Sequence, residues 1–156
     1  MLASGRNKTP LTTAQRERVR EHVSALLPDV EVEFDDAHDA YTHMKETYDA
    51  DSNRVGKLVV AADFLPGNAD PMPNSMVDDL ATAAHELMHI VRWRYQHELD
   101  YKKHRDLEEA FTSLQAAVFF CKDLREQQLV MLANDAMQRL LSHTDRYLGL
   151  CDGNHD

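Results

Sequence analysis

The strongest constraint on the fold is an apolar stripe at helical spacing in the middle of the chain. Its members are Val77, Leu80, Ala84, Leu87 and Val91. Apolar residues at intervals of three and four share one face of an α-helix, so the stripe predicts an amphipathic helix over residues 76–96. Ser75 and Asp78 form a capping pair at its start. Such a helix must bury its apolar face against another layer of structure.

The same helix carries the motif His85-Glu86-Leu87-Met88-His89, which has the form HExxH. Four residues advance a helix by about one turn, so His85 and His89 project from one face and can share one ion. Glu86 would then lie within reach of a water bound to that ion. Two neutral imidazoles suit Zn²⁺, and a catalytic zinc site needs a third protein ligand and an open position for water.

The remaining pattern predicts an α+β fold, with a small sheet in the N-terminal half and helices after it. Thr12 and Gln15 have the form of a capping box, and Pro28 ends the helix that follows them. The segments predicted around the central helix are a helix over 12–27, a strand over 30–34, a helix over 37–48, a strand over 57–64, a helix over 106–121 and a helix over 124–148. We expect a single domain over residues 11–150 with flexible tails at 1–10 and 151–156.

Composition limits the classes of partner and the compartment. The chain has 156 residues, with 17 Lys and Arg against 27 Asp and Glu, so its formal charge is −10. That balance disfavours nucleic acid and anionic membranes as partners. Cys121 and Cys151 are too few for a disulfide framework, and no apolar run reaches the ~20 residues of a membrane span. The first ten residues lack the apolar core of a signal peptide, and we expect a cytoplasmic protein. The oligomeric state is left open.

The third ligand can be sought from the residues after the motif. A metzincin needs Gly and His where this chain has Arg92 and Tyr95, so that class is excluded. A di-iron bundle needs a second Glu-x-x-His pair, which is absent from the sequence. Glu108 and Glu109 remain, at the start of the next predicted helix. Acidic residues also stabilise helix N-termini, so on the residues alone both interpretations stay open.

A family resemblance favours the ligand interpretation. Residues 85–91 read HELMHIV, and Glu109-Ala110-Phe111-Thr112-Ser113 begins twenty residues after His89. Together they resemble the gluzincin metallopeptidases over residues 57–121, and the short chain resembles the minimal single-domain members called minigluzincins. The resemblance implies a minimal zincin-like fold in which His85, His89 and Glu109 bind Zn²⁺ and Glu86 is catalytic. It also implies that the strand over 57–64 is the edge strand above the cleft, where an extended substrate pairs.

One position departs from the gluzincin pattern. Ser113 stands where the family has an aspartate that orients a zinc-binding histidine. Loss of such an orienting group usually weakens metal binding. Asp78 and Asp79 are the candidates to replace it.

The expected function is therefore zinc-dependent hydrolysis of peptide bonds in a peptide or protein, with Glu86 as general base. A zincin-like module that binds partners without proteolysis, and a helical interaction protein with a chance motif, are the alternatives. No donor for the developing oxyanion is assigned, and a surface or packing role is expected for Tyr95, His97, Tyr101, His104 and His143. His38 and His43, five residues apart, make a poor metal pair and are expected on a solvated helix face. The end of the chain, residues 150–156, is a candidate self-inhibitory segment.

Overall fold

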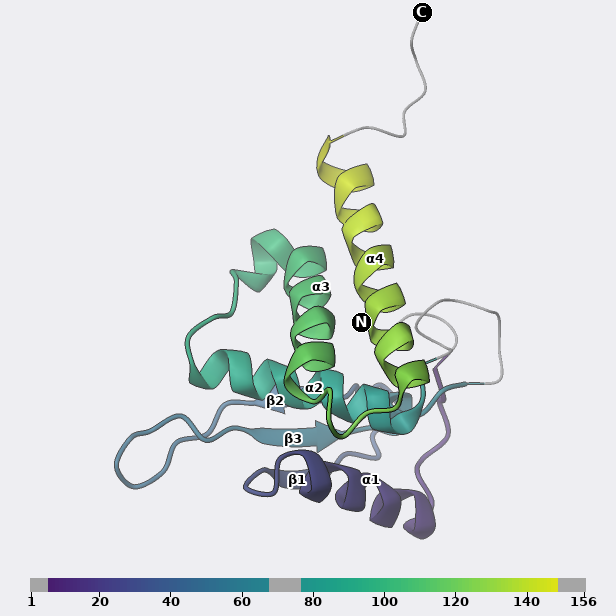
Figure 1. Cartoon of the computed structure of the whole chain (residues 1–156). Coiled ribbons are helices and arrows are strands. Elements are labelled where there is room, and N and C mark those ends of the chain that lie inside the picture. Colours follow the sequence, from purple (N-terminus) through teal and green to yellow (C-terminus); the bar gives the residue numbers. More distant parts are fainter. Residues whose placement is uncertain (1–5, 68–76, 149–156) are drawn as a thin grey trace, which may run out of the picture.

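The computed structural model describes residues 6–67 and 77–148, and it has the predicted α+β class. The elements are α1 (Thr13–Leu26), β1 (Glu31–Phe34), β2 (His43–Lys45), β3 (Lys57–Val60), the short 3-10 helix η1 (Ala62–Phe64), α2 (Asp79–Arg94), α3 (Tyr101–Phe119) and α4 (Glu126–Leu148). Figure 1 shows α1 below a small sheet, α2 above the sheet, and α3 and α4 rising from α2 as an antiparallel pair.

The sheet has the strand order β1-β3-β2. β3 is parallel to β1 and antiparallel to β2, with Met44 opposite Leu58. The expectation that the strand over 57–64 lies at the sheet edge is therefore wrong, because β3 pairs on both sides. The strand also ends at Val60, and residues 62–64 form η1. The burial of Leu58, Val59 and Val60 suits a central strand. The antiparallel edge strand is β2.

The helix predicted over 37–48 is wrong, because the chain there forms β2. Two hydrogen bonds to one side chain fix the start of this strand. The Asp63 carboxylate accepts from the Thr42 backbone N–H at 2.8 Å and from the Thr42 hydroxyl at 2.6 Å. The ladder with β3 supplies the remaining backbone partners. Tertiary pairing thus overrides a local helical period, as it often does for short segments. His43 accordingly lies on a strand and not on a solvated helix face.

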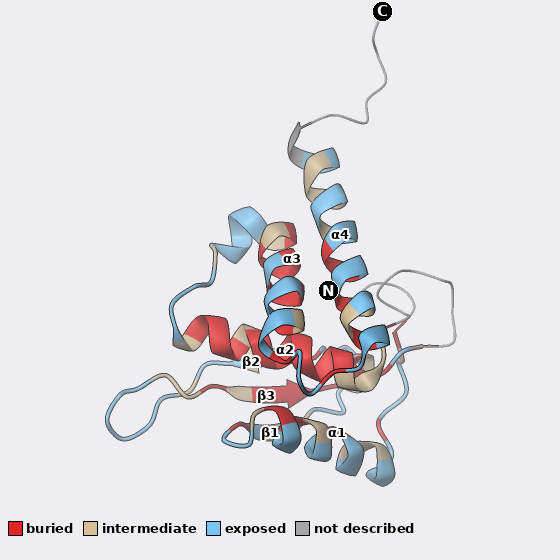
Figure 2. Cartoon of the chain, viewed as in Figure 1, coloured by how far each residue is buried: buried red, intermediate tan, exposed pale blue. Residues whose placement is uncertain are grey.

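The motif helix α2 lies at the centre of the molecule. It contacts α1, β2, β3, α3 and α4, and Figure 2 shows it buried along most of its length. Asp78 caps it by accepting from the Ala81 N–H, whereas Ser75 lies outside the described residues. Gly56, at φ +75°, lets the chain pass close to α2, because a Cβ there would lie 2.8 Å from Ile90 Cγ2.

The predicted break between the last two helices is confirmed, since α3 ends at Phe119 and α4 begins at Glu126. The predicted start of α3 at Asp106 is wrong. Asp100 is the N-cap, and a first turn is followed by a kink at His104, whose φ and ψ are −129° and 34°. Asp106 is instead a buried side chain that faces α4, with Ser142 Oγ at 3.5 Å.

The expected flexible tail over residues 1–10 also needs correction. Residues 1–5 lie outside the described residues, but Arg6 is buried. Its guanidinium donates to the carbonyls of Asp63, Phe64 and Val77 and to the Thr82 hydroxyl. Arg6 therefore joins η1 to the start of α2. Among the described residues, no helix combines the length and apolar character that crossing a membrane requires.

Candidate metal centre

Three sequence-predicted ligands meet in the interior. His85 and His89 are one turn apart on α2, and Glu109 comes from α3. One ligand atom from each residue lies within 4.8 Å of the others. His85 Nε2 is 3.3 Å from Glu109 Oε2, and His89 Nε2 is 3.8 Å from Glu109 Oε1. This buried group could hold a metal ion. Among the described residues this is the one group of three or more His, Cys, Asp or Glu side chains close enough together to hold a metal ion. His38 and His43 belong to no such group.

Hydroxyl groups on α3 fix the orientation of both imidazoles. His85 Nδ1 is 2.8 Å from Ser113 Oγ, and His89 Nδ1 is 3.3 Å from Thr112 Oγ1. Each hydroxyl has one proton, and each gives it to an oxygen that only accepts: Ser113 to the Asp135 carboxylate at 2.6 Å, Thr112 to the Glu108 carbonyl at 2.8 Å. The Nδ1 atoms must therefore be the donors. In the neutral rings the lone pairs are then on Nε2, the atoms that face Glu109.

Ser113, the position at which the sequence departs from the gluzincin pattern, contacts a carboxylate on α4. A serine has no carboxylate to offer the histidine, but here its hydroxyl connects His85 to the carboxylate of Asp135 on α4. Asp135 is itself held by Arg139 Nε at 3.3 Å. The two residues predicted to replace the family's aspartate have other partners. Asp78 caps α2 and accepts a hydrogen bond from Gln128, and Asp79 pairs with Arg18. That expectation is wrong, and the carboxylate that lies behind His85, through the Ser113 hydroxyl, is Asp135.

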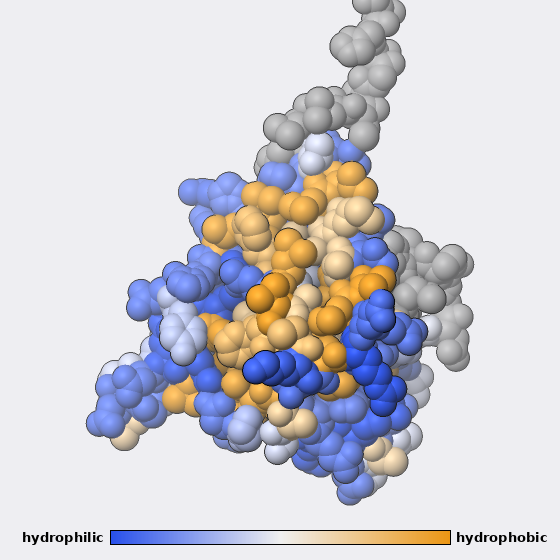
Figure 3. All heavy atoms as spheres, viewed as in Figure 1, coloured by the Kyte–Doolittle hydropathy of each residue, from blue (hydrophilic) through white to orange (hydrophobic). Residues whose placement is uncertain are grey.

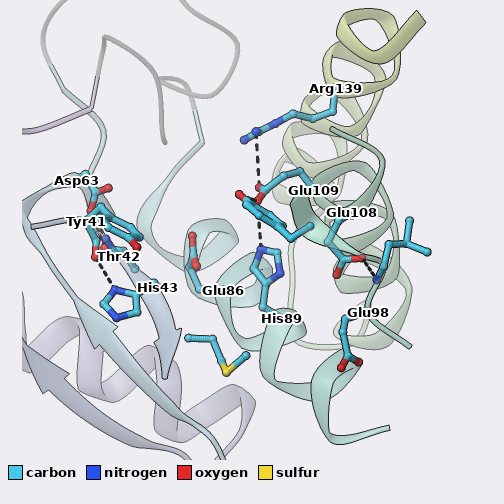
Figure 4. Close-up of a pocket in the computed structure, with 13 residues that line it drawn as sticks. Tyr41, Thr42, His43, Asp63, Glu86, His89, Glu98, Glu108, Glu109 and Arg139 are labelled. Atoms are coloured by element: carbon cyan, nitrogen blue, oxygen red, sulfur yellow. Dashed lines mark hydrogen bonds and ion pairs between the residues drawn. The ribbon is translucent and has the colours of Figure 1, made fainter. Parts of the chain in front are cut away.

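A cavity of about 330 Å³ opens in front of the cluster. In Figure 4, Glu86 and His89 lie on its floor, with Asp63 and Thr42 on the side of the sheet and Glu109 and Arg139 on the side of α3 and α4. The edge strand β2 and the residues before it form one wall, from Tyr41 to Met44. A ligand that enters this cavity therefore meets His89 and Glu109 of the candidate metal group, together with Glu86 and the edge of β2.

The charges of the cluster are strongly coupled. Burial raises the pKa of Glu86 to about 7, and the neighbouring Glu109 carboxylate adds to the effect. Burial lowers the pKa of His89 to about 4. Burial also opposes the charged forms of His85 and Glu109, but their mutual hydrogen bond and charge outweigh it. The pKa of His85 is therefore raised and that of Glu109 lowered.

Glu108 and Glu109 have separate roles. The Glu108 carboxylate accepts from Arg92 Nε at 2.8 Å and Nη2 at 2.6 Å, and from the Leu99 N–H at 2.8 Å. Both partners of this ion pair are almost fully buried. A bidentate pair of this kind joins α3 to the end of α2. Glu108 is thus committed to Arg92, which leaves Glu109 for the cluster.

Two polar side chains beside the cluster face the cavity. Tyr101 Oη donates to Glu109 Oε1 at 2.8 Å, and Arg139 Nη1 is 3.6 Å from Glu109 Oε2. Burial, followed by the charge of Glu109, raises the pKa of Tyr101 to about 12, so the phenol remains a donor. The other aromatic and histidine side chains considered for this position, Tyr95, His97, His104 and His143, do not line the cavity.

Sequence reasoning missed Thr112, Asp135 and Arg139. A usable signal was present on the last helix. Asp135 and Arg139 are four residues apart and fall on the same face as the buried Leu132, where an amphipathic helix normally carries apolar residues. Polar residues at such positions must have polar partners in the interior. What they contact depends on how α4 packs on α2 and α3.

The chain was also compared with known proteins. No protein-family description, curated protein or solved structure matches it. The chemical interpretation of the site therefore depends on the residues themselves.

Proposed function

We propose that this chain is a zinc-dependent peptidase of the gluzincin type. The observation that carries the proposal is the cluster of His85, His89 and Glu109, with Glu86 beside it on the floor of an open cavity. Two imidazoles and one carboxylate are a characteristic ligand set of catalytic zinc, which keeps a further position open for water. A structural zinc site would instead be closed by a fourth protein ligand.

The spacing of the ligand atoms fits zinc. Bonds of about 2.0–2.1 Å in a tetrahedral site place neighbouring ligand atoms about 3.3 Å apart. The Glu109 carboxylate comes close to this value with each of its two oxygens, Oε2 at 3.3 Å from His85 Nε2 and Oε1 at 3.8 Å from His89 Nε2. The Nδ1 atoms are engaged by hydroxyls, so the ligand set needs no change of tautomer to accept the ion. Zinc bound by these three residues would supply a water of lowered pKa and polarise the scissile carbonyl.

The chain's own residues would carry the proton and hold the substrate. Glu86 accepts the proton of the attacking water and passes it to the leaving nitrogen. Tyr101 Oη and the Arg139 guanidinium donate hydrogen bonds to the carbonyl oxygen as it gains negative charge. An extended peptide pairs with the free edge of β2, which forms the cavity wall. The edge strand assigned to this task is thus β2, in place of residues 57–64.

The test combines metal analysis with peptide digestion. Protein purified without a metal-affinity tag should hold about one zinc per chain and cleave members of a peptide library, and a chelator should abolish the cleavage. Glu86→Gln should keep the zinc and lose about 10²–10⁴-fold in kcat. Glu98→Gln is the matched control, because Glu98 lines the same cavity but pairs with Arg54. It should retain activity.

Each outcome has a distinct meaning. Full activity of Glu86→Gln with zinc bound contradicts the mechanism. Zinc bound by an inactive wild-type chain favours a metal-binding module that acts by recognition. Absence of zinc leaves a helical interaction protein in which the motif has no metal role.

A further inference from the structure

The last helix, α4, directs charged side chains into the molecule. Asp135 is buried, the side chain of Arg139 is 16% exposed, and both contact residues of α3. Figure 3 shows apolar side chains at the surface over α3 and α4 instead, on the side turned to the viewer. Buried charges cost free energy unless they have polar partners. The space next to Asp135 and Arg139 is therefore the place to look for further partners.

A small cavity of about 20 Å³ lies there, between α2 and α4. Its polar lining consists of Thr82 and Glu86 from α2, Asp135 and Arg139 from α4, and Arg6 from the beginning of the chain. Glu86 and Arg139 also line the open cavity of about 330 Å³ described above. Glu86 therefore borders two cavities, of which the open one contains the candidate metal ligands His89 and Glu109 and the small one does not.

The Glu86 carboxylate is nearly buried, yet it lacks a protein partner. The exposed fraction of Glu86 is 5%. Within residues 6–67 and 77–148, no hydrogen bond or ion pair includes either of its oxygens. Buried carboxylates normally accept hydrogen bonds from protein groups or from ordered water. Because Glu86 borders two cavities, the partners of its oxygens would be molecules that enter them.

The charges around the small cavity are balanced. Arg6 and Arg139 supply two positive charges, and Glu86 and Asp135 supply two negative ones. Burial lowers the pKa of Arg6, and the charge of Glu86 opposes this change more strongly than those of Asp63 and Asp135. An ion in the small cavity would disturb the balance. A neutral molecule that donates to carboxylates and accepts from guanidinium groups suits this lining.

We propose that the small cavity binds one interior water molecule, which donates a hydrogen bond to the Glu86 carboxylate. A cavity needs about 10–15 Å³ to hold a water, and the water needs two to four polar partners. The volume of about 20 Å³ admits one molecule. Arg139 Nη atoms make no hydrogen bond within the described residues and donate to the water, and Asp135 is a further acceptor.

The water connects the candidate general base to the same carboxylate that lies behind His85. Asp135 reaches His85 through the Ser113 hydroxyl and Glu86 through the water. A hydrogen bond on the side of the small cavity restricts rotation of the Glu86 carboxylate, so that one oxygen keeps facing the open cavity. The water is thus a positioning group and takes no part in the reaction. This catalytic consequence rests on the proposed function, whereas the water site does not.

A high-resolution crystal structure of the whole chain tests the water site. It should show one ordered water within about 3 Å of a Glu86 oxygen and of a polar atom of Asp135 or Arg139. The measurement requires neither bound zinc nor peptidase activity, so its outcome is separate from that of the proposed function. A small cavity without ordered density, or one that holds an ion, overturns the proposal.

Val77→Ile tests what the water does. Val77 lines the small cavity and is 7% exposed, so one added methylene should displace the water. We expect kcat to fall about 10-fold while KM and zinc affinity stay unchanged, because Glu86 loses a hydrogen bond. Val91→Ile is the matched control, since Val91 is 8% exposed and lines neither cavity. It should keep the water and the wild-type kcat.

Crystal structures of both variants establish whether the water is present. If Val77→Ile retains it or fails to fold, Leu132→Phe adds bulk to the small cavity from α4. A variant that lacks the water but keeps the wild-type kcat overturns the positioning role. An equal loss of kcat in Val91→Ile overturns it as well, because the effect would then come from packing in general.

Discussion

The Ser113 hydroxyl donates a hydrogen bond of 2.6 Å to the Asp135 carboxylate while it accepts one from His85 Nδ1 at 2.8 Å. This relation connects a candidate metal ligand on α2 to a buried charge on α4 through a side chain on α3. A carboxylate behind a ligand histidine fixes the ring and raises its basicity. In this chain Ser113 lies between the two groups and would transmit that effect to His85.

We therefore predict that Ser113→Ala weakens zinc binding by about 10–100-fold, because His85 loses its orienting partner. Competition with a chromogenic chelator measures the change in Kd. Ser142→Ala removes a hydroxyl that faces Asp106, away from the histidines, and serves as the control. It should bind zinc like wild type. Equal affinities of the two variants would show that the hydroxyl at position 113 has no influence on the metal.

Glu108 and Glu109 should give opposite results despite their adjacency. Glu109→Gln should reduce zinc affinity by more than about 100-fold, because it replaces a charged ligand. Glu108→Gln should retain the metal but lower the free energy of unfolding by about 3 kcal/mol, because it breaks the buried pair with Arg92. Urea denaturation and metal titration of both variants provide the comparison. Loss of zinc from Glu108→Gln in the folded state contradicts this division of roles.

Tyr101→Phe separates two roles of the phenol. If Tyr101 stabilises the oxyanion, kcat should fall by about 100-fold while KM and zinc affinity stay close to those of wild type. Steady-state kinetics and metal titration on the same preparation measure both. A variant that loses zinc affinity in proportion to activity would indicate that Tyr101 acts only by positioning Glu109. Tyr95→Phe, outside the cavity, is the control.

Asp79 should make the free energy of unfolding depend on pH in the acid range. It lies in the first turn of α2, pairs with Arg18 and is 3.4 Å from His22. The hydrogen bond with His22 lowers its pKa below the usual 3.8. A lowered pKa means that the folded state favours the carboxylate, so its contribution is complete above the unfolded pKa and disappears as pH falls through the folded one.

Asp79→Asn should accordingly lower the free energy of unfolding by about 1 kcal/mol at pH 7. The difference from wild type should shrink as the pH falls below about 4. Urea melts at neutral and acid pH measure it. Asp51→Asn, an exposed turn residue, is the control. A difference that grows toward acid pH would contradict the assigned sign.

The sequence by itself determined the elements that depend on local pattern. The stripe around Leu87 predicted α2, and the four-residue spacing of His85 and His89 placed both imidazoles on one face, since helical geometry is fixed by the backbone alone. The resemblance selected Glu109 among adjacent carboxylates, and the structure brings it to the histidines. The end of α3 and the start of α4 also followed from local signals.

Only the tertiary structure decided which distant groups meet. Residues 43–45 became a strand because β3 offered backbone partners, although their own period favoured a helix. Arg6 and Asp135 became buried polar partners because η1, α2 and α3 presented acceptors and donors to them. The sequence shows that such groups exist, but a hydrogen bond between residues 113 and 135 depends on a distance that only packing sets. For that reason the candidate ligands could be predicted from the chain, whereas the contacts that orient them could not.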